Sequence, residues 1–413
     1  MSRNIITALD VGTSTVQAVI AEKRRGEDSP RILGIGISPS HGVRRGVVVD
    51  CDDASAAIQA AMEDARKAAG VQTRSVWVTV GGAHVSVSSS RGIIAVSRAD
   101  GEISPEDVGR AIAAAETFIP KNPNREILHM IPRDFRVDAE AGIKDPIGMH
   151  GVRLEVDTLI IDCSRPFLKN LFKCVEGAGL KIVDYVFSPL AAAEVVLTKR
   201  QKELGSMVLD IGGGTASFMV FEEGVPIHAG VLPIGGGHIT NDVAIGFRTD
   251  VDVAEKIKLV YGSCLSVELP KRENIRLAEF VEGESALYSR RELAEIIEAR
   301  LRDIFELLQK ELRKINRAAL LPGGVVVVGG SAATRGLIDL TKREMKLPVA
   351  IGVPQGFEIS DEEKASAFSA ALGVVRWAYA KGGGGDGGIW LRGRKLGDFS
   401  GDKIMSWFKS FLP

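Results

Sequence analysis

The chain has 413 residues and a mass of 44.1 kDa, more than one hydrophobic core usually supports, so two or more domains are expected. Its 45% hydrophobic and 25% charged residues are typical of a soluble globular protein. A formal net charge of −1 argues against a nucleic-acid partner. No apolar stretch approaches the roughly 18 residues of a membrane-spanning helix, and the first residues show no signal-peptide pattern.

The cysteines show neither CxxC pairing nor the spacing of metal ligands. They are Cys51, Cys163, Cys174 and Cys264. We expect these side chains to be reduced thiols in a cytosolic chain.

The first eighty residues alternate apolar runs with turn residues and then with a helical pattern. The predicted elements are strands at 4–10, 15–22 and 31–37, a helix over 53–69 and a buried strand at 76–80. Asp52 or Asp53 is expected to cap the helix. Small side chains on this helix favour close packing: Ala56, Ala57, Ala60, Ala61 and Ala65.

Residues 84–164 are expected to form a small α+β insert. Its predicted elements are strands at 85–97, 126–137 and 152–162 and one helix between the first two strands. Ser104 as N-cap, Pro105 at the first position and Asp107 at the third mark the start of that helix. The chain is then expected to continue through helices at 166–178 and 189–199.

The second half of the chain repeats the opening pattern over 206–232, as strand, glycine loop, strand, turn and strand. The later predicted elements are a helical region at 236–262, a long amphipathic helix at 290–316, a buried strand at 325–328, and helices at 334–344 and 361–380. The sequence therefore predicts two related halves.

Each half carries an Asp followed by a glycine turn between two apolar runs. The residues are Asp10, Gly12, Thr13 and Ser14 in the first half, and Asp210, Gly212, Gly213, Gly214 and Thr215 in the second. Glycines let backbone amides approach phosphate oxygens, and the two carboxylates are expected to hold Mg²⁺ through its water shell. One such loop is an ordinary β-turn more often than not, but two copies predict a nucleotide bound between the halves.

Two further segments are candidates for binding the nucleoside. Gly329, Gly330 and Ser331 follow a buried strand and fit a base-binding turn or a plain strand-to-helix connection. Glu255 and Lys258 lie one helical turn apart and fit either a ribose and purine contact or a solvated salt bridge.

The C-terminal region changes composition sharply. Residues 381–401 are rich in glycine and predict a flexible linker. Residues 402–413 predict an amphipathic helix that binds a membrane surface, or alternatively a groove of protein. Its apolar face is Ile404, Met405, Trp407, Phe408, Phe411 and Leu412, and Lys403 and Lys409 lie on the opposite face.

The order of these loops resembles the actin-like ATPase superfamily. That likeness implies an α/β fold of the duplicated, ribonuclease-H-like kind, with two lobes that bind ATP and Mg²⁺. Within the superfamily, residues 142–151, residues 232–244 and the amphipathic end resemble the bacterial cell-division family FtsA. The division of the chain that this implies is a first-lobe core at 1–83 and 165–200, an insert at 84–164, a second-lobe core at 201–232 and 301–360, a smaller helical lobe at 233–300, a closing helix at 361–380, a linker at 381–401 and a membrane-targeting helix at 402–413.

The FtsA resemblance implies a protein that polymerises on the cytoplasmic face of the inner membrane at the division site. It implies binding of the C-terminal peptide of the division GTPase FtsZ by the smaller lobe, where Arg300 is a candidate contact. It also implies recruitment of later division proteins by the insert. The usual lysine of the first loop is absent, and Ser188 stands where active relatives carry Gln or Glu, so ATP hydrolysis is expected to be slow or vestigial.

Two other functions are compatible with the same fold. One is that of a PilM-like pilus-assembly homologue, which shares the type of insert but is not expected to carry a glycine linker with an amphipathic end. The other is that of a small-molecule kinase, for which the sequence offers no catalytic carboxylate near the second loop.

Overall fold

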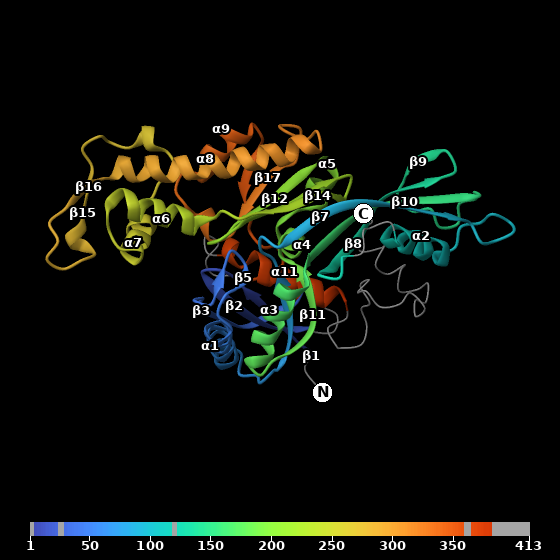
Figure 1. The fold of residues 1–413 in the computed structure, drawn as a ribbon, viewed down its shortest axis with the longest axis horizontal. Helices are drawn as coiled ribbons and strands as arrows, with labels where there is room; N and C mark the ends of the chain where they lie inside the picture. Colours follow the sequence, from blue (N-terminus) through green and yellow to red (C-terminus); the bar gives the residue numbers. More distant parts are fainter. Residues whose placement is uncertain (1–3, 24–28, 118–121, 359–364, 382–413) are drawn as a thin grey trace.

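Two lobes, each built on a five-stranded sheet, and a smaller insert make up the molecule (Figure 1). The computed structural model describes residues 4–23, 29–117, 122–358 and 365–381. Within these ranges no helix is long and apolar enough to cross a membrane. The predicted linker and amphipathic helix lie outside the described residues.

Lobe 1 is built on a sheet with strand order β11-β6-β1-β2-β3. Its strands are β1 (Asn4–Val11), β2 (Thr15–Lys23), β3 (Arg31–Pro39), β6 (Ser75–Val80) and β11 (Lys181–Phe187). The first three form an antiparallel meander, and β6 and β11 run parallel to β1. A short hairpin of β4 (Val43–Arg44) and β5 (Val47–Val48) leads from the meander to the first helix.

Lobe 2 repeats this arrangement with strand order β14-β13-β12-β17-β18. The strands are β12 (Ser206–Ile211), β13 (Ala216–Glu222), β14 (Val225–Leu232), β17 (Gly324–Val328) and β18 (Val349–Ile351). Here too an antiparallel meander is followed by two parallel strands. The register also repeats, since Asp10 pairs with Gln17 and Asp210 with Ser217. The predicted duplication of the chain is confirmed.

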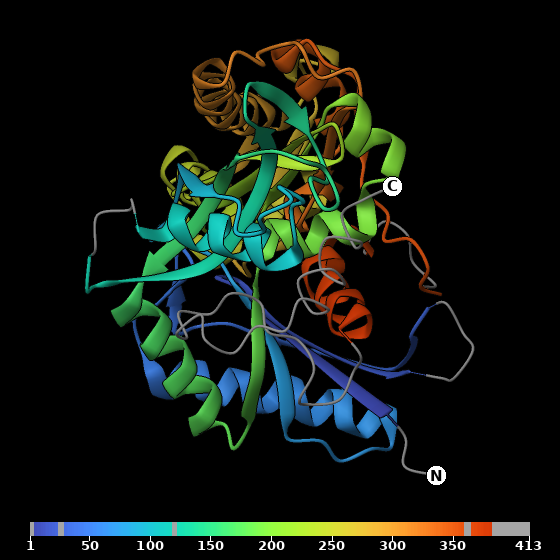
Figure 2. The same cartoon turned by 90° about the vertical axis from the view of Figure 1, so that its right-hand side faces the viewer.

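Helices cover both faces of the lobe 1 sheet (Figures 1 and 2). They are α1 (Cys51–Ala69), α3 (Arg165–Gly177), α4 (Ser188–Val196) and α11 (Ser369–Ala380). Helix α4 is apolar and buried almost all round, because it packs on α11 and also on strands β12 and β13 of lobe 2. The close approach of α11 to α4 requires Gly373, where a Cβ atom would lie 1.9 Å from the carbonyl oxygen of Ala191.

The helices of lobe 2 include the longest of the described helices, and several of them extend away from lobe 1 (Figure 1). They are α5 (Lys199–Leu204), α6 (Gly236–Phe247), α7 (Val251–Tyr261), α8 (Arg290–Lys314) and α9 (Leu337–Met345), with a small sheet of β15 (Asn274–Arg276) and β16 (Leu287–Ser289). The apolar stripe predicted for the long helix faces the lobe 2 core, where Leu293, Ile297, Leu301 and Leu308 are fully or almost fully buried.

The insert has its own four-stranded sheet and its own core. Its elements are β7 (Val85–Ala95), α2 (Pro105–Thr117), β8 (Arg125–Val137), β9 (Glu140–Ile143) and β10 (Arg153–Ser164). Ser104 caps α2 as predicted, since its Oγ accepts from the Asp107 amide at 3.2 Å and the Asp107 carboxylate accepts from the Ser104 amide. Although the insert interrupts lobe 1, it also contacts edge strand β14 of lobe 2, where Arg133 donates to the carbonyl of Ile227.

Several predicted boundaries are wrong, each for a local reason. Helix α1 is capped by Asp50, not by Asp52 or Asp53, because the Asp50 carboxylate accepts from the amides of both of those residues at 3.0 Å. The helix predicted at 189–199 ends at Val196, and Thr198 begins a second helix with a capping box.

The helical region predicted at 236–262 is confirmed and consists of two helices, separated where Arg248 adopts a left-handed conformation. The helix predicted at 334–344 begins only at Leu337, after a short 3-10 turn. Residues 361–364 of the helix predicted at 361–380 lie outside the described residues, and α11 begins at Ser369.

The small side chains of α1 pack as predicted on one side only. Ala57, Ala61 and Ala65 are buried, whereas Ala56 and Ala60 are exposed. The buried alanines face glycines of β3, and a Cβ atom at Gly36 would lie 1.9 Å from the carbonyl oxygen of Ala61.

We predict that Gly36→Ala lowers the free energy of unfolding by about 2 kcal/mol, because α1 would have to move away from β3. The exposed change Ala60→Gln on the same helix is expected to stay within about 0.5 kcal/mol of the parent. Urea denaturation of the three proteins measures the difference. Equal unfolding energies for both variants would contradict the tight contact.

Candidate functional site

The two predicted glycine loops have the same backbone structure. In the turn between β1 and β2, the Gly12 amide donates to the carbonyl oxygen of Thr15 at 3.0 Å. In the turn between β12 and β13, the Gly212 amide donates to the carbonyl oxygen of Thr215 at 2.9 Å. Each turn therefore presents its free amides and hydroxyls beyond the end of a buried strand.

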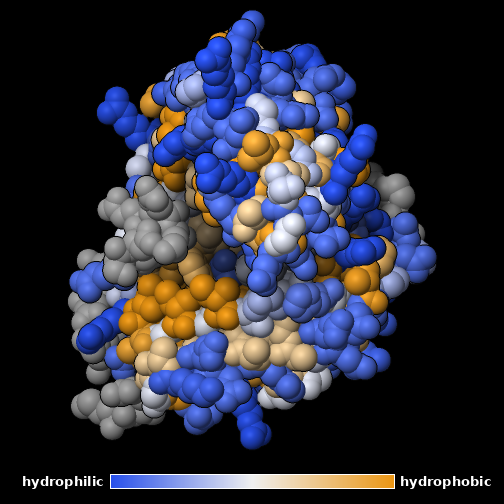
Figure 3. All heavy atoms as spheres, turned by 90° about the vertical axis from the view of Figure 1, so that its left-hand side faces the viewer, coloured by the Kyte–Doolittle hydropathy of each residue, from blue (hydrophilic) through white to orange (hydrophobic). Residues whose placement is uncertain are grey.

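The loops also meet each other across the junction of the lobes. A Cβ atom at Gly213 would lie 1.9 Å from Ser14 Oγ, and one at Gly214 would lie 2.6 Å from Thr13 Oγ1. Only glycine permits this approach. Figure 3 shows the surface hollowed between the two halves of the molecule.

Asp10 and Asp210 are the second-last residues of strands β1 and β12 at this junction. Desolvation, and secondly the charge of Asp10, raise the pKa of Asp210 to about 7. Desolvation also raises the pKa of Asp10, and a hydrogen bond from the Thr79 hydroxyl partly offsets that effect. Two carboxylates that repel each other in a poorly solvated site favour a cation between them.

The donor set fits Mg²⁺ held mainly by phosphate and water. Mg²⁺ keeps several waters and typically takes one or two carboxylates together with substrate phosphates. Across the described ranges no group of three or more His, Cys, Asp or Glu side chains gathers to hold a metal ion without further ligands. Asp10 and Asp210 would supply the protein's share, directly or through water.

The third glycine segment lies against the second loop. Gly329 has a positive φ of 89°, and a Cβ atom there would lie 2.3 Å from Asp210 Oδ1. A Cβ atom at Gly236 would lie 2.7 Å from Ser331 Oγ, and the Gly236 amide donates to the Gly212 carbonyl at 2.9 Å. The structure thus brings the second loop, the start of α6 and the 329–331 segment together, with Gly330 in open space.

Glu255 and Lys258 form a salt bridge of 2.6 Å on α7. The Lys258 ammonium also donates to Thr240 Oγ1 at 2.8 Å and to the carbonyl of Gly236 at 3.3 Å. The pair therefore forms the predicted salt bridge, and it lies beside the segment that contacts the second glycine loop. The contact with ribose and purine stays a prediction.

Arg300 lies on α8 and pairs with acidic side chains. Its guanidinium binds the carboxylate of Asp242 through two hydrogen bonds of 2.6 and 2.9 Å and also contacts Asp303. A partner that binds Arg300 would have to compete with the carboxylates of Asp242 and Asp303. The predicted membrane-binding residues lie outside the described residues.

Sequence reasoning missed several residues at the junction. Thr79 donates to Asp10, the amide of Gly46 donates to Thr13 Oγ1 at 3.0 Å, and a Cβ atom at Gly235 would lie 2.4 Å from the carbonyl of Gly212. A glycine run follows the strand that carries Thr79, and another contains Gly235. Glycine runs of this kind indicate places where two backbone segments approach each other closely.

Two family models match the chain. The model described as "Cell division protein FtsA" matches residues 207–373, and the model described as "SHS2 domain inserted in FTSA" matches residues 82–162.

Curated relatives named "Cell division protein FtsA" match over nearly the whole chain. The relative from Pseudomonas aeruginosa is 35% identical over 92% of this chain and 90% of its own length. Those from Borreliella burgdorferi and Bacillus subtilis are 37% and 34% identical, over 92% and 96% of this chain and 92% and 87% of their own lengths. The chain belongs to the FtsA family. The resemblance inferred from the glycine loops, residues 142–151 and residues 232–244 is confirmed.

Solved structures of low sequence identity share the fold. The PilM–PilN type IV pilus biogenesis complex gives a TM-score of 0.66 at 17% identity, over 90% of this chain and 97% of the matched chain. MreB5 of Spiroplasma citri bound to ADP gives 0.52 at 14% identity, over 89% and 94%. The fold is actin-like with an inserted SHS2 domain, as predicted for an FtsA family member.

The raised pKa of Asp210 predicts how stability depends on pH in cation-free protein. The unfolded chain loses this proton near the ordinary pKa of 3.8 and the folded chain only near 7, so stability falls as pH rises between these values. In EDTA, Asp210→Asn should therefore melt above the parent by a margin that grows from pH 5 to pH 8. The exposed change Asp64→Asn serves as control, and an equal margin at both pH values would contradict the assignment.

Proposed function

We propose that this FtsA family member binds ATP with Mg²⁺ between its lobes and works as a cytoskeletal adaptor in cell division. It would polymerise on the cytoplasmic face of the inner membrane and attach the FtsZ ring to that membrane. The observation that carries the proposal is the meeting of two equivalent glycine loops, each beginning with an aspartate, across the junction of two equivalent sheets.

The nucleotide would span the junction and separate the two loops, which touch in this structure, so that its phosphates contact both of them. Backbone amides and the hydroxyls of Thr13, Ser14 and Thr215 would bind the phosphates. The segment of Gly329, Gly330 and Ser331 and the Glu255–Lys258 pair would lie on the nucleoside side. MreB5 of Spiroplasma citri, which shares the fold, was solved with ADP.

Hydrolysis is expected to be slow. Ser188 begins α4, and its Cβ atom lies 3.5 Å from the Cβ position of Gly81, close to the end of β6. A serine hydroxyl at this point orients an attacking water poorly compared with Gln or Glu. The bound nucleotide would therefore act chiefly to hold the lobes together, which suits a filament subunit.

The remaining surfaces would serve partners. We assign the helical part at 233–300 to the C-terminal peptide of FtsZ, the insert to neighbouring subunits and later division proteins, and residues 402–413 to membrane lipids. The insert supports this assignment because it has a separate core and its own sheet, so it presents a surface independent of the nucleotide junction.

A PilM-like role in pilus assembly is the second candidate, and the fold likeness to the PilM–PilN complex favours it. The FtsA relatives, at 34–37% identity, favour the division role. A kinase role lacks a catalytic carboxylate near Thr215, where Ala216 and Ser217 follow. Incubation with labelled ATP and a panel of small acceptors tests for phosphate transfer.

We predict that Asp10→Asn and Asp210→Asn each weaken binding of Mg-ATP about tenfold or more, measured by titration calorimetry. Asp64→Asn, on the exposed face of α1, should leave the affinity unchanged. Because the carboxylates act through the cation, the parent and both variants should have similar affinities for ATP when EDTA removes Mg²⁺. Retained affinity in both folded variants would contradict the proposed site.

Removal of residues 402–413 should abolish sedimentation with vesicles that contain anionic phosphatidylglycerol. Trp407→Glu should do the same, because it puts a charge on the apolar face, whereas Ser410→Ala on the polar face should not. High salt should weaken binding of the parent by screening its lysines. Undiminished binding of the truncated chain would refute the membrane anchor.

A further inference from the structure

Two cysteines far apart in the sequence meet on the outer side of lobe 1. Cys51 is the first residue of α1, and Cys174 lies in the second half of α3. Their Sγ atoms are 2.7 Å apart, although 123 positions separate the residues. A disulfide bond is about 2.05 Å long, so a small rotation of the side chains suffices to join the sulfurs.

The two helices are held at this distance by contacts next to the thiols. The hydroxyl of Ser55 donates to the carbonyl of Cys174 at 3.0 Å. A Cβ atom at Gly177 would lie only 3.1 Å from Ser55 Oγ, so glycine allows the end of α3 to approach α1 closely. The sulfurs therefore meet because the helices pack, and the meeting does not depend on a mobile loop.

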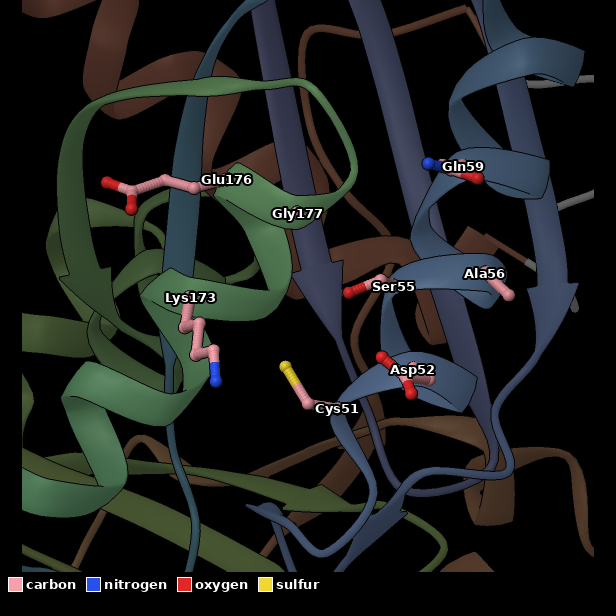
Figure 4. Close-up of a pocket in the computed structure, with 8 residues that line it drawn as sticks. All are labelled: Cys51, Asp52, Ser55, Ala56, Gln59, Lys173, Glu176 and Gly177. Atoms are coloured by element: carbon pink, nitrogen blue, oxygen red, sulfur yellow. The ribbon is translucent and has the colours of Figure 1, made fainter.

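The two thiols differ in their access to solvent. Cys51 is partly exposed and lines a cavity of about 500 Å³ between α1 and α3, together with Asp52, Lys173 and Glu176 (Figure 4). Cys174 is fully buried, and burial, then the contact with Cys51, raise its pKa to about 12. Cys51 is thus the thiol that an oxidant reaches first.

We propose that Cys51 and Cys174 form a reversible disulfide in response to hydroperoxides. The Cys51 thiolate attacks one peroxide oxygen, the O–O bond breaks, and Cys51 becomes a sulfenic acid. The sulfur of Cys174 then attacks the Cys51 sulfur, expels hydroxide and releases its proton, which together leave as water. The two thiols lose two electrons and two protons in total, and hydrogen peroxide is reduced to two water molecules.

The bond would close a covalent loop around the insert. Strands β6 to β10 and helix α2 all lie between the two cysteines in the sequence. The bond would also fix the start of α1, directly after the β4–β5 hairpin whose Gly46 donates to Thr13 in the first glycine loop. Oxidation would therefore restrain both the insert and the hairpin that covers this loop.

The test treats the purified full chain with hydrogen peroxide and counts thiols with a mass-tagged maleimide after denaturation. Four reactive thiols should fall to two, a tryptic peptide pair should link Cys51 to Cys174, and dithiothreitol should restore all four. Cys51→Ser should form no internal disulfide, whereas Cys163→Ala/Cys264→Ala, which removes two buried cysteines, should form it as the parent does. The oxidised parent should melt about 5 °C or more above the reduced parent.

Three results would overturn the proposal: a parent that keeps four thiols, a linkage between different molecules, or Cys51 oxidised to sulfinic acid without a bond to Cys174. A rise in melting temperature that persists in Cys51→Ser would also overturn it. Cys51 is partly exposed, so this variant is expected to fold, and Cys174→Ala provides a second variant from the other helix. None of these readouts depends on nucleotide, membrane or partner binding.

Discussion

The contact between two glycine turns at the junction of the lobes constrains the rest of the structure. Gly213 and Gly214 lie so close to Ser14 and Thr13 that any larger side chain in the second turn would push the lobes apart. The same contact places Asp10 and Asp210 near each other, where their charges conflict. In the proposed complex, a magnesium-bound polyphosphate would relieve that conflict and connect both lobes, because it would supply the positive ion and accept hydrogen bonds from amides of both turns.

The two sheets repeat, but the helices and the insert that surround them differ between the lobes. Helix α4 is buried between the two lobes and packs on strands of both sheets. The insert carries an independent core yet touches β14 of lobe 2 through Arg133. The insert therefore contacts both lobes, although its core is separate from theirs.

Local patterns in the sequence predicted the duplicated strands and the aspartate–glycine turns, because strand, turn and strand lie within about twenty residues of each other. The cap at Asp50 was missed because three acidic candidates, Asp50, Asp52 and Asp53, lie within four residues, and only the backbone geometry selects among them. Thr79 at Asp10, and Asp242 at Arg300, were missed because those contacts join residues 69 and 58 positions apart. These contacts depend on tertiary packing, which cannot be inferred from the spacing of residues in the sequence.

A crystal structure with a non-hydrolysable ATP analogue and Mg²⁺ tests the central claim most directly. The account predicts phosphate density between the turns at residues 12–14 and 212–215, with the ion's water shell facing both aspartates and the base near residues 329–331. Density for the analogue at any other place would contradict the proposed site. So would two turns that remain in contact at saturating analogue, with no density between them.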